Sequence, residues 1–247
     1  MKIMNYKKIK LSPNGTFFTI DGKKVFKTFK EALKFHEPGL APVQDKTGWY
    51  HIDIQGKSLY KERYLRTFGF YNNRAAVIDF KNNWFHINTK GERCYDENFA
   101  WCGNYQEDLC TVRNFKGNYF HLNIFGKRAY NENYIYAGDF KDGYAAVRLK
   151  SGLYKHIDYN GKDLNGKLYK ELGVFHKNYA TAKDEKGWFH INKKGEELYS
   201  ERYTMIEPFY NGFALVEDFK NRKLIINETG NISVLIKTTT SGHQTNI

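Results

Sequence analysis

Five histidines recur at nearly equal spacing, and they are the residues whose type could carry chemistry. They are His51, His86, His121, His156 and His190, separated by 35, 35, 35 and 34 residues, and a glutamate column follows them at Glu62, Glu97, Glu132 and Glu201. Imidazole and carboxylate groups together could bind a metal ion or relay a proton. A zinc site, however, needs three or four ligands about 2 Å from one point, whereas one histidine per repeat is spread along the chain. We therefore interpret both columns as structural and expect no metal and no cofactor.

A structural role for these residues makes a specific prediction. A buried polar group needs a hydrogen-bond partner, and repetition of the sequence reproduces the same pairing in each unit. We expect each histidine to bond a backbone carbonyl or the glutamate of its own repeat, so that His86, for example, pairs with Glu97.

No other set of residues predicts catalysis. A glycosidase needs two facing carboxyl groups in different environments, but Glu207 and Asp163, which lie outside the repeated columns, have no visible partner. The cysteines, Cys94, Cys102 and Cys110, lie eight residues apart without an identifiable base to activate a nucleophile. Their odd, sparse count indicates a reducing compartment and not a disulfide framework. We expect no catalytic residue and no enzymatic activity.

The segments that position the histidines repeat with the same period. A glycine follows each histidine by about five residues, at Gly56, Gly91, Gly126, Gly161 and Gly195, and polar pairs recur at Asn72-Asn73, Glu107-Asp108, Asp142-Gly143, Lys177-Asn178 and Asn211-Gly212. Pairs of this kind tolerate positive φ and favour two-residue hairpin turns. The alternation in WFHIN and AAVIDF predicts strands. Each repeat is therefore predicted to hold four short antiparallel strands, as a propeller blade does.

Counting the repeats gives the predicted fold. Complete units span residues 27–60, 64–95, 99–130, 134–169, 172–199 and 203–236, and residues 6–26 supply a further partial set of strands. If residues near 235–240 add the missing strand, the sheets close into a ring without exposed edges. We predict an all-β repeat protein of about seven 35-residue units in one domain, residues 1–237, and favour a closed β-propeller over an open β-hairpin solenoid. Residues 238–247 are predicted to be a disordered tail.

Two segments depart from this pattern. The stretch FKTFKEALKFHEPGL, residues 26–40, has apolar residues at helical spacing and predicts a short helix. Residues 163–173 are interpreted as an insertion, which aligns Tyr169 with the tyrosine column of Tyr60, Tyr95, Tyr130 and Tyr199.

The repeated columns resemble the bacterial WG-repeat family. The pattern is Gly, two aromatic residues, His-Ile, Asp or Asn, then Gly-Lys, with Tyr-x-Glu downstream, and the likeness extends over about residues 15–235. The Gly-Trp pair is clear at Gly48-Trp49 and Gly187-Trp188 and is replaced in the other copies. The resemblance implies a β-rich interaction module without an assigned reaction, and it transfers no catalytic residues.

Charge and aromatic residues suggest where a partner would bind. The formal net charge is +12, which favours anionic partners. The turn between the second and third predicted strands carries Lys81, Lys116, Lys150, Lys186 and Lys220, partly offset by Asp79, Asp184 and Asp218. These lysines are a candidate docking surface for an acidic protein, a nucleic-acid backbone or an anionic glycan. The column of Trp49, Trp84 and Trp188 would either pack between repeats or, in an open stack, face carbohydrate.

We therefore expect a non-enzymatic scaffold that binds a protein, with carbohydrate binding through the aromatic rings or nucleic-acid binding through the lysines as the alternatives. The N-terminal segment has no apolar run of signal-peptide length, and no stretch approaches the roughly 18 apolar residues of a membrane span. A monomeric, cytoplasmic protein is expected.

Overall fold

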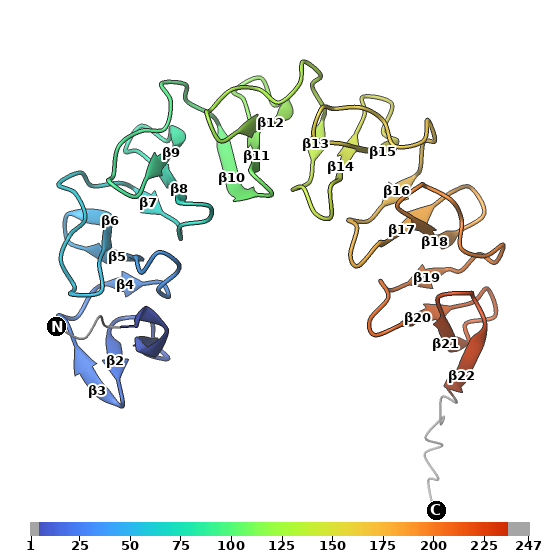
Figure 1. Cartoon of the computed structure of the whole chain (residues 1–247), viewed down its shortest axis with the longest axis horizontal. Coiled ribbons are helices and arrows are strands. Elements are labelled where there is room, and N and C mark those ends of the chain that lie inside the picture. The colour runs from blue at the N-terminus through green and yellow to red at the C-terminus, as the bar shows by residue number, and fades with distance from the viewer. Residues whose placement is uncertain (1–4, 237–247) are drawn as a thin grey trace, which may run out of the picture. The chain divides into compact units, whose positions relative to one another are not determined.

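Short antiparallel sheets account for almost all regular structure in the computed structural model, which describes residues 5–236 (Figure 1). The chain divides into two compact units. The first ends at Phe140 and also includes residues 159–161, and the second comprises residues 141–158 and the chain from Lys162 onward. Whether the two units form the predicted single domain stays a prediction. Within residues 5–236 no helix is long and apolar enough to cross a membrane.

The first unit contains four three-stranded sheets in which strands adjacent in sequence are hydrogen-bonded. The first two are β1 (Lys10–Leu11), β2 (Phe18–Ile20) and β3 (Lys23–Val25), then β4 (Glu31–Ala32), β5 (Ala41–Asp45) and β6 (Gly48–Ile52). The next two are β7 (Arg66–Thr67), β8 (Arg74–Ile78) and β9 (Trp84–Asn88), then β10 (Trp101–Gln106), β11 (Leu109–Arg113) and β12 (Tyr119–Asn123). Strand β13 (Tyr136–Ala137) also lies in this unit.

The second unit continues the pattern. Strand β14 (Ala145–Arg148) pairs with β15 (Tyr154–Ile157), and a three-stranded sheet follows with β16 (Glu171–Leu172), β17 (Tyr179–Lys183) and β18 (Trp188–Asn192). The last sheet has four strands, β19 (Met205–Ile206), β20 (Phe213–Glu217), β21 (Lys223–Asn227) and β22 (Ile232–Ile236). The predicted all-β repeat is thus confirmed. Residues 237–247, which include most of the expected closing strand and the predicted tail, lie outside the described residues, so closure of a ring stays a prediction.

The polar pairs form the predicted two-residue hairpins. Asn72 and Asn73 have φ of 49° and 59°, and Asn211 and Gly212 have φ of 50° and 84°. The remaining pairs, at 107–108, 142–143 and 177–178, also have positive φ at both positions. This conformation matches the twist of the flanking strands.

Among the described residues the predicted fourth strand forms only in the last sheet, where it contains one bulge. In the repeat of β4–β6 the corresponding segment makes two isolated bridges, Ile52 to Ser58 and Trp49 to Tyr64, and the chain bulges between them around Tyr60. The bulge allows the Tyr60 ring to turn into the core, where it packs against two hydrophobic clusters. In the last repeat Val234 takes the tyrosine position, and β22 pairs with β21 from Ile232 to Ile236 with one bulge, at Ser233.

The helix expected at residues 26–40 is wrong. Phe26 has a φ of 63°, which no right-handed helix contains, and Lys30 donates its N–H to the Gln44 carbonyl next to the β4–β5 pair. The apolar spacing instead reflects aromatic packing, because Phe26, Phe29 and Phe35 all contact the buried ring of Phe18.

The insertion expected at residues 163–173 is also wrong. Tyr169 forms a bridge with Tyr154 just as Tyr134 does with Tyr119, so Tyr169 occupies the second aromatic position of its repeat. The first aromatic position, nine residues after the histidine, is held by Asn165. The segment 163–173 therefore keeps the usual length and changes one residue type.

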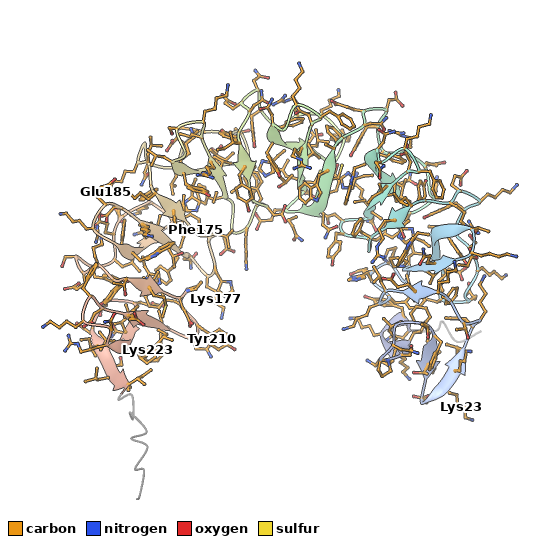
Figure 2. All side chains as sticks on the ribbon, turned by 180° about the vertical axis from the view of Figure 1, so that it is seen from behind. Lys23, Phe175, Lys177, Glu185, Tyr210 and Lys223 are labelled. Atoms are coloured by element: carbon orange, nitrogen blue, oxygen red, sulfur yellow. The ribbon has the colours of Figure 1, made fainter. Side chains whose placement is uncertain are left out.

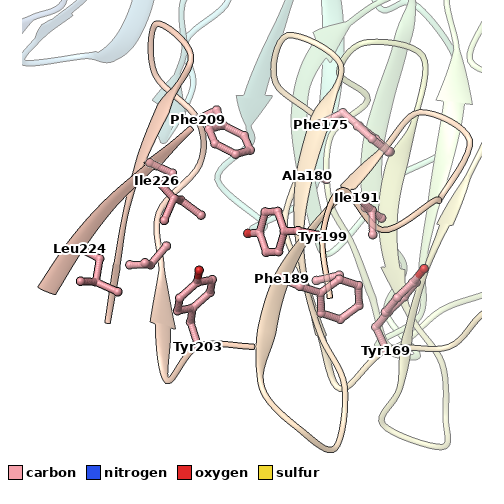
Figure 3. Close-up of a cluster of buried hydrophobic side chains, with 13 residues drawn as sticks. Tyr169, Phe175, Ala180, Phe189, Ile191, Tyr199, Tyr203, Phe209, Leu224 and Ile226 are labelled. Carbon is pink, nitrogen blue, oxygen red and sulfur yellow. The ribbon is translucent and has the colours of Figure 1, made fainter. Parts of the chain in front are cut away.

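Successive repeats pack through the tyrosine of one and the glycine of the next. In Figure 3 the Tyr199 ring lies between Ile191 of its own repeat and Ile226 of the following one. A Cβ added to Gly230 would lie 2.7 Å from Tyr199, and one added to Gly91 would lie 2.3 Å from Tyr60. Because these glycines also have positive φ, both the backbone and the neighbouring ring exclude a side chain.

Replacing Gly91 by alanine tests this packing against a matched control. Gly91 and Gly117 have φ of +84° and +82°, but a Cβ at Gly117 would meet nothing within 4 Å. We expect Gly117→Ala to cost about 1 kcal/mol of unfolding free energy from backbone strain alone. Gly91→Ala should cost about 1–3 kcal/mol more because the Tyr60 ring must move. Urea unfolding measures both, and equal losses in the two variants would contradict the packing argument.

Candidate binding surface

Each repeated histidine joins its repeat to the next one. His51 Nε2 bonds the carbonyl of Phe68 at 2.8 Å, and the same bond reaches Gly103, Gly138, Gly173 and Glu207 from His86, His121, His156 and His190. The acceptor is always 17 residues further along, beside the first strand of the following repeat. The imidazoles are buried, with exposed fractions of 2% or less.

The second ring nitrogen bonds a tyrosine of the same repeat. His51 Nδ1 is 2.6 Å from the hydroxyl of Tyr60, and His86 makes the equivalent bond to Tyr95 at 2.6 Å. The same pairing joins His121 to Tyr130 and His190 to Tyr199. Since a carbonyl can only accept, Nε2 carries the proton and Nδ1 accepts from the tyrosine. The expected bond to a carbonyl is therefore present, whereas the expected pair of His86 with Glu97 is wrong because both of its ring nitrogens are occupied.

Burial keeps these histidines uncharged. Desolvation lowers the pKa of all five from 6.5 to about 4, against the opposing effect of the backbone carbonyl. His156 differs in one respect, because Asn165 replaces the tyrosine of its repeat and the buried Nδ1 of His156 has no hydrogen-bond partner. The Asn165 amide donates instead to the Tyr169 hydroxyl and the Gly195 carbonyl, both at 3.1 Å.

The predicted structural glutamates act through their backbone. The carbonyls of Glu62, Glu97, Glu132 and Glu201 accept hydrogen bonds from Arg63, Arg93, Arg128 and Arg202, while their side chains are exposed. Each of these guanidinium groups also stacks on an aromatic ring, as Arg93 does on Phe85 at 3.8 Å. The arginine thereby satisfies the carbonyls of the bulge around the tyrosine. The sequence pattern does not predict this role, because the position of the arginine varies. Arg93 and Arg128 precede the glutamate of their repeat, whereas Arg63 and Arg202 follow it.

The cysteines occupy packing positions. Cys102 and Cys110 are buried, and burial raises the pKa of the Cys110 thiol to about 12. Cys94 is half-buried, and burial raises its pKa as well. A thiol that stays protonated is a poor nucleophile. Within residues 5–236 no three His, Cys, Asp or Glu side chains come close enough to share a metal ion.

The tryptophan column packs between neighbouring side chains. Trp49 is 2% exposed and lies under the Arg66 guanidinium at 3.9 Å. The half-buried ring of Trp84 stacks on Phe68 with centroids 5.3 Å apart, and the Lys183 ammonium lies 5.2 Å from the half-buried ring of Trp188. Each of these rings thus already has a neighbouring side chain in contact with one face.

The candidate lysines all stand in the turn between the second and third strands of a repeat. Lys81 and Lys116 lie in the first unit, and Lys150, Lys186 and Lys220 lie in the second, all exposed. Among the described residues none of the five forms an ion pair. They therefore remain available to a partner.

The acidic residues of these turns are already engaged. Asp79 accepts the N–H groups of Lys81 and Asn83 at 2.8 and 2.9 Å. Desolvation opposes ionisation of Asp79, but these bonds and the Asn83 side chain outweigh it and lower its pKa. Asp184 and Asp218 make the same turns and are paired with Arg202 and Arg222 at 2.9 and 2.7 Å. Their charges offset arginines more directly than they offset the lysines.

Three of these turns also expose a phenylalanine, which the sequence analysis missed. Phe80, Phe115 and Phe219 immediately precede Lys81, Lys116 and Lys220 and are 62%, 66% and 63% exposed. The Phe80 ring lies against Gly48, where an added Cβ would approach it to 3.2 Å, and Phe219 lies against Gly187 in the same way. These rings could have been found in the sequence, because Asp-Phe-Lys or Asn-Phe-Lys recurs at residues 79–81, 114–116 and 218–220.

The opposite end of each repeat has different chemistry. Figure 2 shows, in the second unit, Glu185 of the β17–β18 turn pointing away from Lys177 and Tyr210 at the hairpin end. There the Lys177 ammonium lies 5.7 Å from the Tyr210 ring. In the first unit the hairpin end carries Glu107 and Asp108, which bond Tyr159 and Asn72. Within residues 5–236 the combination of an exposed phenylalanine and an adjacent lysine recurs in the turns between the second and third strands, at Phe80, Phe115 and Phe219.

Together these features define an all-β repeat protein whose repeated polar residues hold the repeats together. Residues 188–218 match the family model of the WG containing repeat, which confirms the resemblance derived from the sequence. A comparison with curated proteins gave no match.

Solved structures with limited similarity include BamB from Moraxella catarrhalis, at 14% identity and TM-score 0.45 over 81% of this chain and 71% of that one. The computationally designed Ika8 protein has 12% identity and TM-score 0.49 over 92% and 83%. The WD40 β-propeller domain of Doa1 has 12% identity and TM-score 0.34 over 85% and 86%. The fold assignment rests on the strands and repeats described above.

The low pKa of the histidines predicts loss of stability in acid. Between pH 6.5 and about 4 the unfolded chain binds protons that the folded chain excludes, so stability falls as the pH falls through this range. Each histidine contributes up to about 1.4 kcal/mol per pH unit. Urea midpoints measured from pH 7.5 to 5 should therefore decrease, and His86→Gln should reduce the slope by about one proton. A midpoint that stays constant or rises on acidification would contradict the neutral, buried state.

Removing one tyrosine hydroxyl tests its bond to histidine. In Tyr60→Phe the Nδ1 acceptor of buried His51 loses its donor, which should cost about 1–3 kcal/mol of unfolding free energy. Tyr210→Phe is the control, since Tyr210 is 72% exposed, and it should change stability by less than about 0.5 kcal/mol. Equal stability of the two variants in urea would show that the hydroxyl contributes nothing.

Proposed function

We propose that this chain is a non-enzymatic scaffold that binds a protein partner through the β-turns between the second and third strands of its repeats. In the first unit this turn surface comprises Phe80, Lys81, Phe115 and Lys116. In the second unit the corresponding residues are Lys150, Lys186, Phe219 and Lys220. The observation that carries the proposal is the exposure of three phenylalanine rings, each beside an unpaired lysine.

The exposed rings support a protein partner. A large aromatic side chain in contact with water gains free energy when a partner covers it, and such residues often dominate interface affinity. The neighbouring ammonium groups complement an acidic rim and would speed association. A partner with an apolar patch bordered by Asp or Glu therefore fits this surface best.

The alternatives fit less well. A carbohydrate stacks on exposed aromatic faces, but Trp49 is buried, and one face of Trp84 and of Trp188 already lies next to Phe68 and Lys183. A nucleic-acid backbone would use the lysines and leave Phe80 and Phe115 without a role. Its binding would also weaken steeply with salt.

Affinity capture with matched variants tests the proposal. The full chain should retain a partner that resists nuclease treatment, and Phe80→Ser/Phe115→Ser should weaken its binding by at least about tenfold, as loss of a buried aromatic anchor does. Phe125→Ser is the control, because Phe125 is 72% exposed but lies in the turn after β12. Equal weakening by the control, or loss of the captured material on nuclease treatment, would overturn the proposal.

A further inference from the structure

The last sheet ends in an apolar strand whose outer edge is unpaired among the described residues. Strand β22 pairs with β21 on one side only. Its large side chains are exposed, Ile232 by 59%, Val234 by 53%, Leu235 by 49% and Ile236 by 39%. The strand has a bulge between Ile232 and Val234, but the consecutive residues Val234 and Leu235 point to opposite faces, so both faces of the strand are apolar. An edge of this kind is a template for another strand.

The last repeat has lost the residues that join a repeat to its successor. Ile225, Val234 and Lys223 stand 35 residues after His190, Tyr199 and Trp188. The contacts to the preceding repeat are retained, since the Glu207 carbonyl bonds His190 and Gly230 packs on Tyr199. The side of this repeat that faces away from the preceding repeat therefore lacks the histidine that every earlier histidine-bearing repeat carries there.

We propose that β22 pairs antiparallel with β22 of a second copy of this chain, which continues the last sheet across a twofold axis. Antiparallel pairing of identical strands is self-complementary, because each strand offers the same row of N–H and C=O groups. With Val234 on the axis, the two Val234 residues oppose each other, and the bulge that Ser233 makes against β21 lies beside them. The strand ISVLI has no charged residue, so the +12 charge of the chain adds no direct repulsion within the pair.

Other segments of the chain fit this edge less well. Strand β3 is the outer strand of the first sheet, but it carries the exposed residues Lys23 and Lys24, and edge lysines oppose strand pairing. Figure 2 shows Lys23 at the tip of that strand. The segment 237–247, KTTTSGHQTNI, has Ile247 as its one large apolar residue. It could bury little of the apolar surface of β22.

The predicted association is weak and reversible. A five-residue strand pair lies at the low end of interface sizes, where complexes are transient. The monomer expected from the sequence then corresponds to the dilute state. This inference is independent of the turn surface, so failure of either proposal leaves the other standing.

Sedimentation velocity of the full chain from about 1 µM to about 500 µM tests the dimer, a range that spans weak association. The wild type should shift from monomer to dimer mass, and Val234→Lys, which places two ammonium groups together on the axis, should stay monomeric. Phe125→Lys should dimerise as the wild type does, since it adds the same charge at an exposed site in another sheet. A monomeric wild type at the highest concentration, or a Val234→Lys variant that still dimerises, would overturn the proposal.

A cross-link keeps the test decisive if the lysine variant unfolds. Opposed residues of an antiparallel pair lie close enough for a disulfide. Oxidised Val234→Cys should therefore run as a covalent dimer, while the wild type, whose cysteines are buried or half-buried, should not. Absence of the covalent dimer at high concentration would contradict a twofold axis at Val234.

Discussion

The structure depends on a buried, uncharged imidazole that donates to the backbone of the next repeat. This bond satisfies a carbonyl beside the next repeat's first strand and, in four of the five cases, the other nitrogen accepts from a tyrosine hydroxyl. A protonated ring could no longer accept at Nδ1, so the pairing requires the neutral state that burial imposes. The positions of the tyrosine and the glycine, and the bulge around the tyrosine, all follow from this geometry. The tyrosine must reach the histidine of its own repeat and still fit against the next repeat.

One consequence is that the most regular residues of the sequence are the least available for binding. Histidine, tyrosine and arginine each have an internal partner that recurs from repeat to repeat, as His51, Tyr60 and Arg63 show. A function must therefore use side chains that the stacking does not require. The exposed phenylalanines beside the turn lysines are such side chains, since their removal would leave the histidine hydrogen bonds between repeats in place.

Departures from the pattern are equally informative. Asn165 in place of tyrosine leaves His156 with an unpartnered buried nitrogen, which is a local cost in stability. Ile225 and Val234 in the last repeat replace the histidine and the tyrosine together, and there the fourth segment forms strand β22. The strand formed there has exposed apolar side chains.

From the sequence alone, the period, the strands, the two-residue hairpins and the structural status of the histidines could be predicted, because strand alternation and turn preference are local properties. The partner of His86 could not, since Tyr95 and Glu97 both lie within reach along the chain and only the bulge decides which side chain turns inward. The helical spacing of apolar residues at 26–40 led to a wrong prediction, because the phenylalanine rings of this segment pack on Phe18, which lies outside it. Exposure of Phe80 and of β22 was likewise decided by tertiary structure, since burial depends on which neighbouring repeat covers a residue and not on its own type.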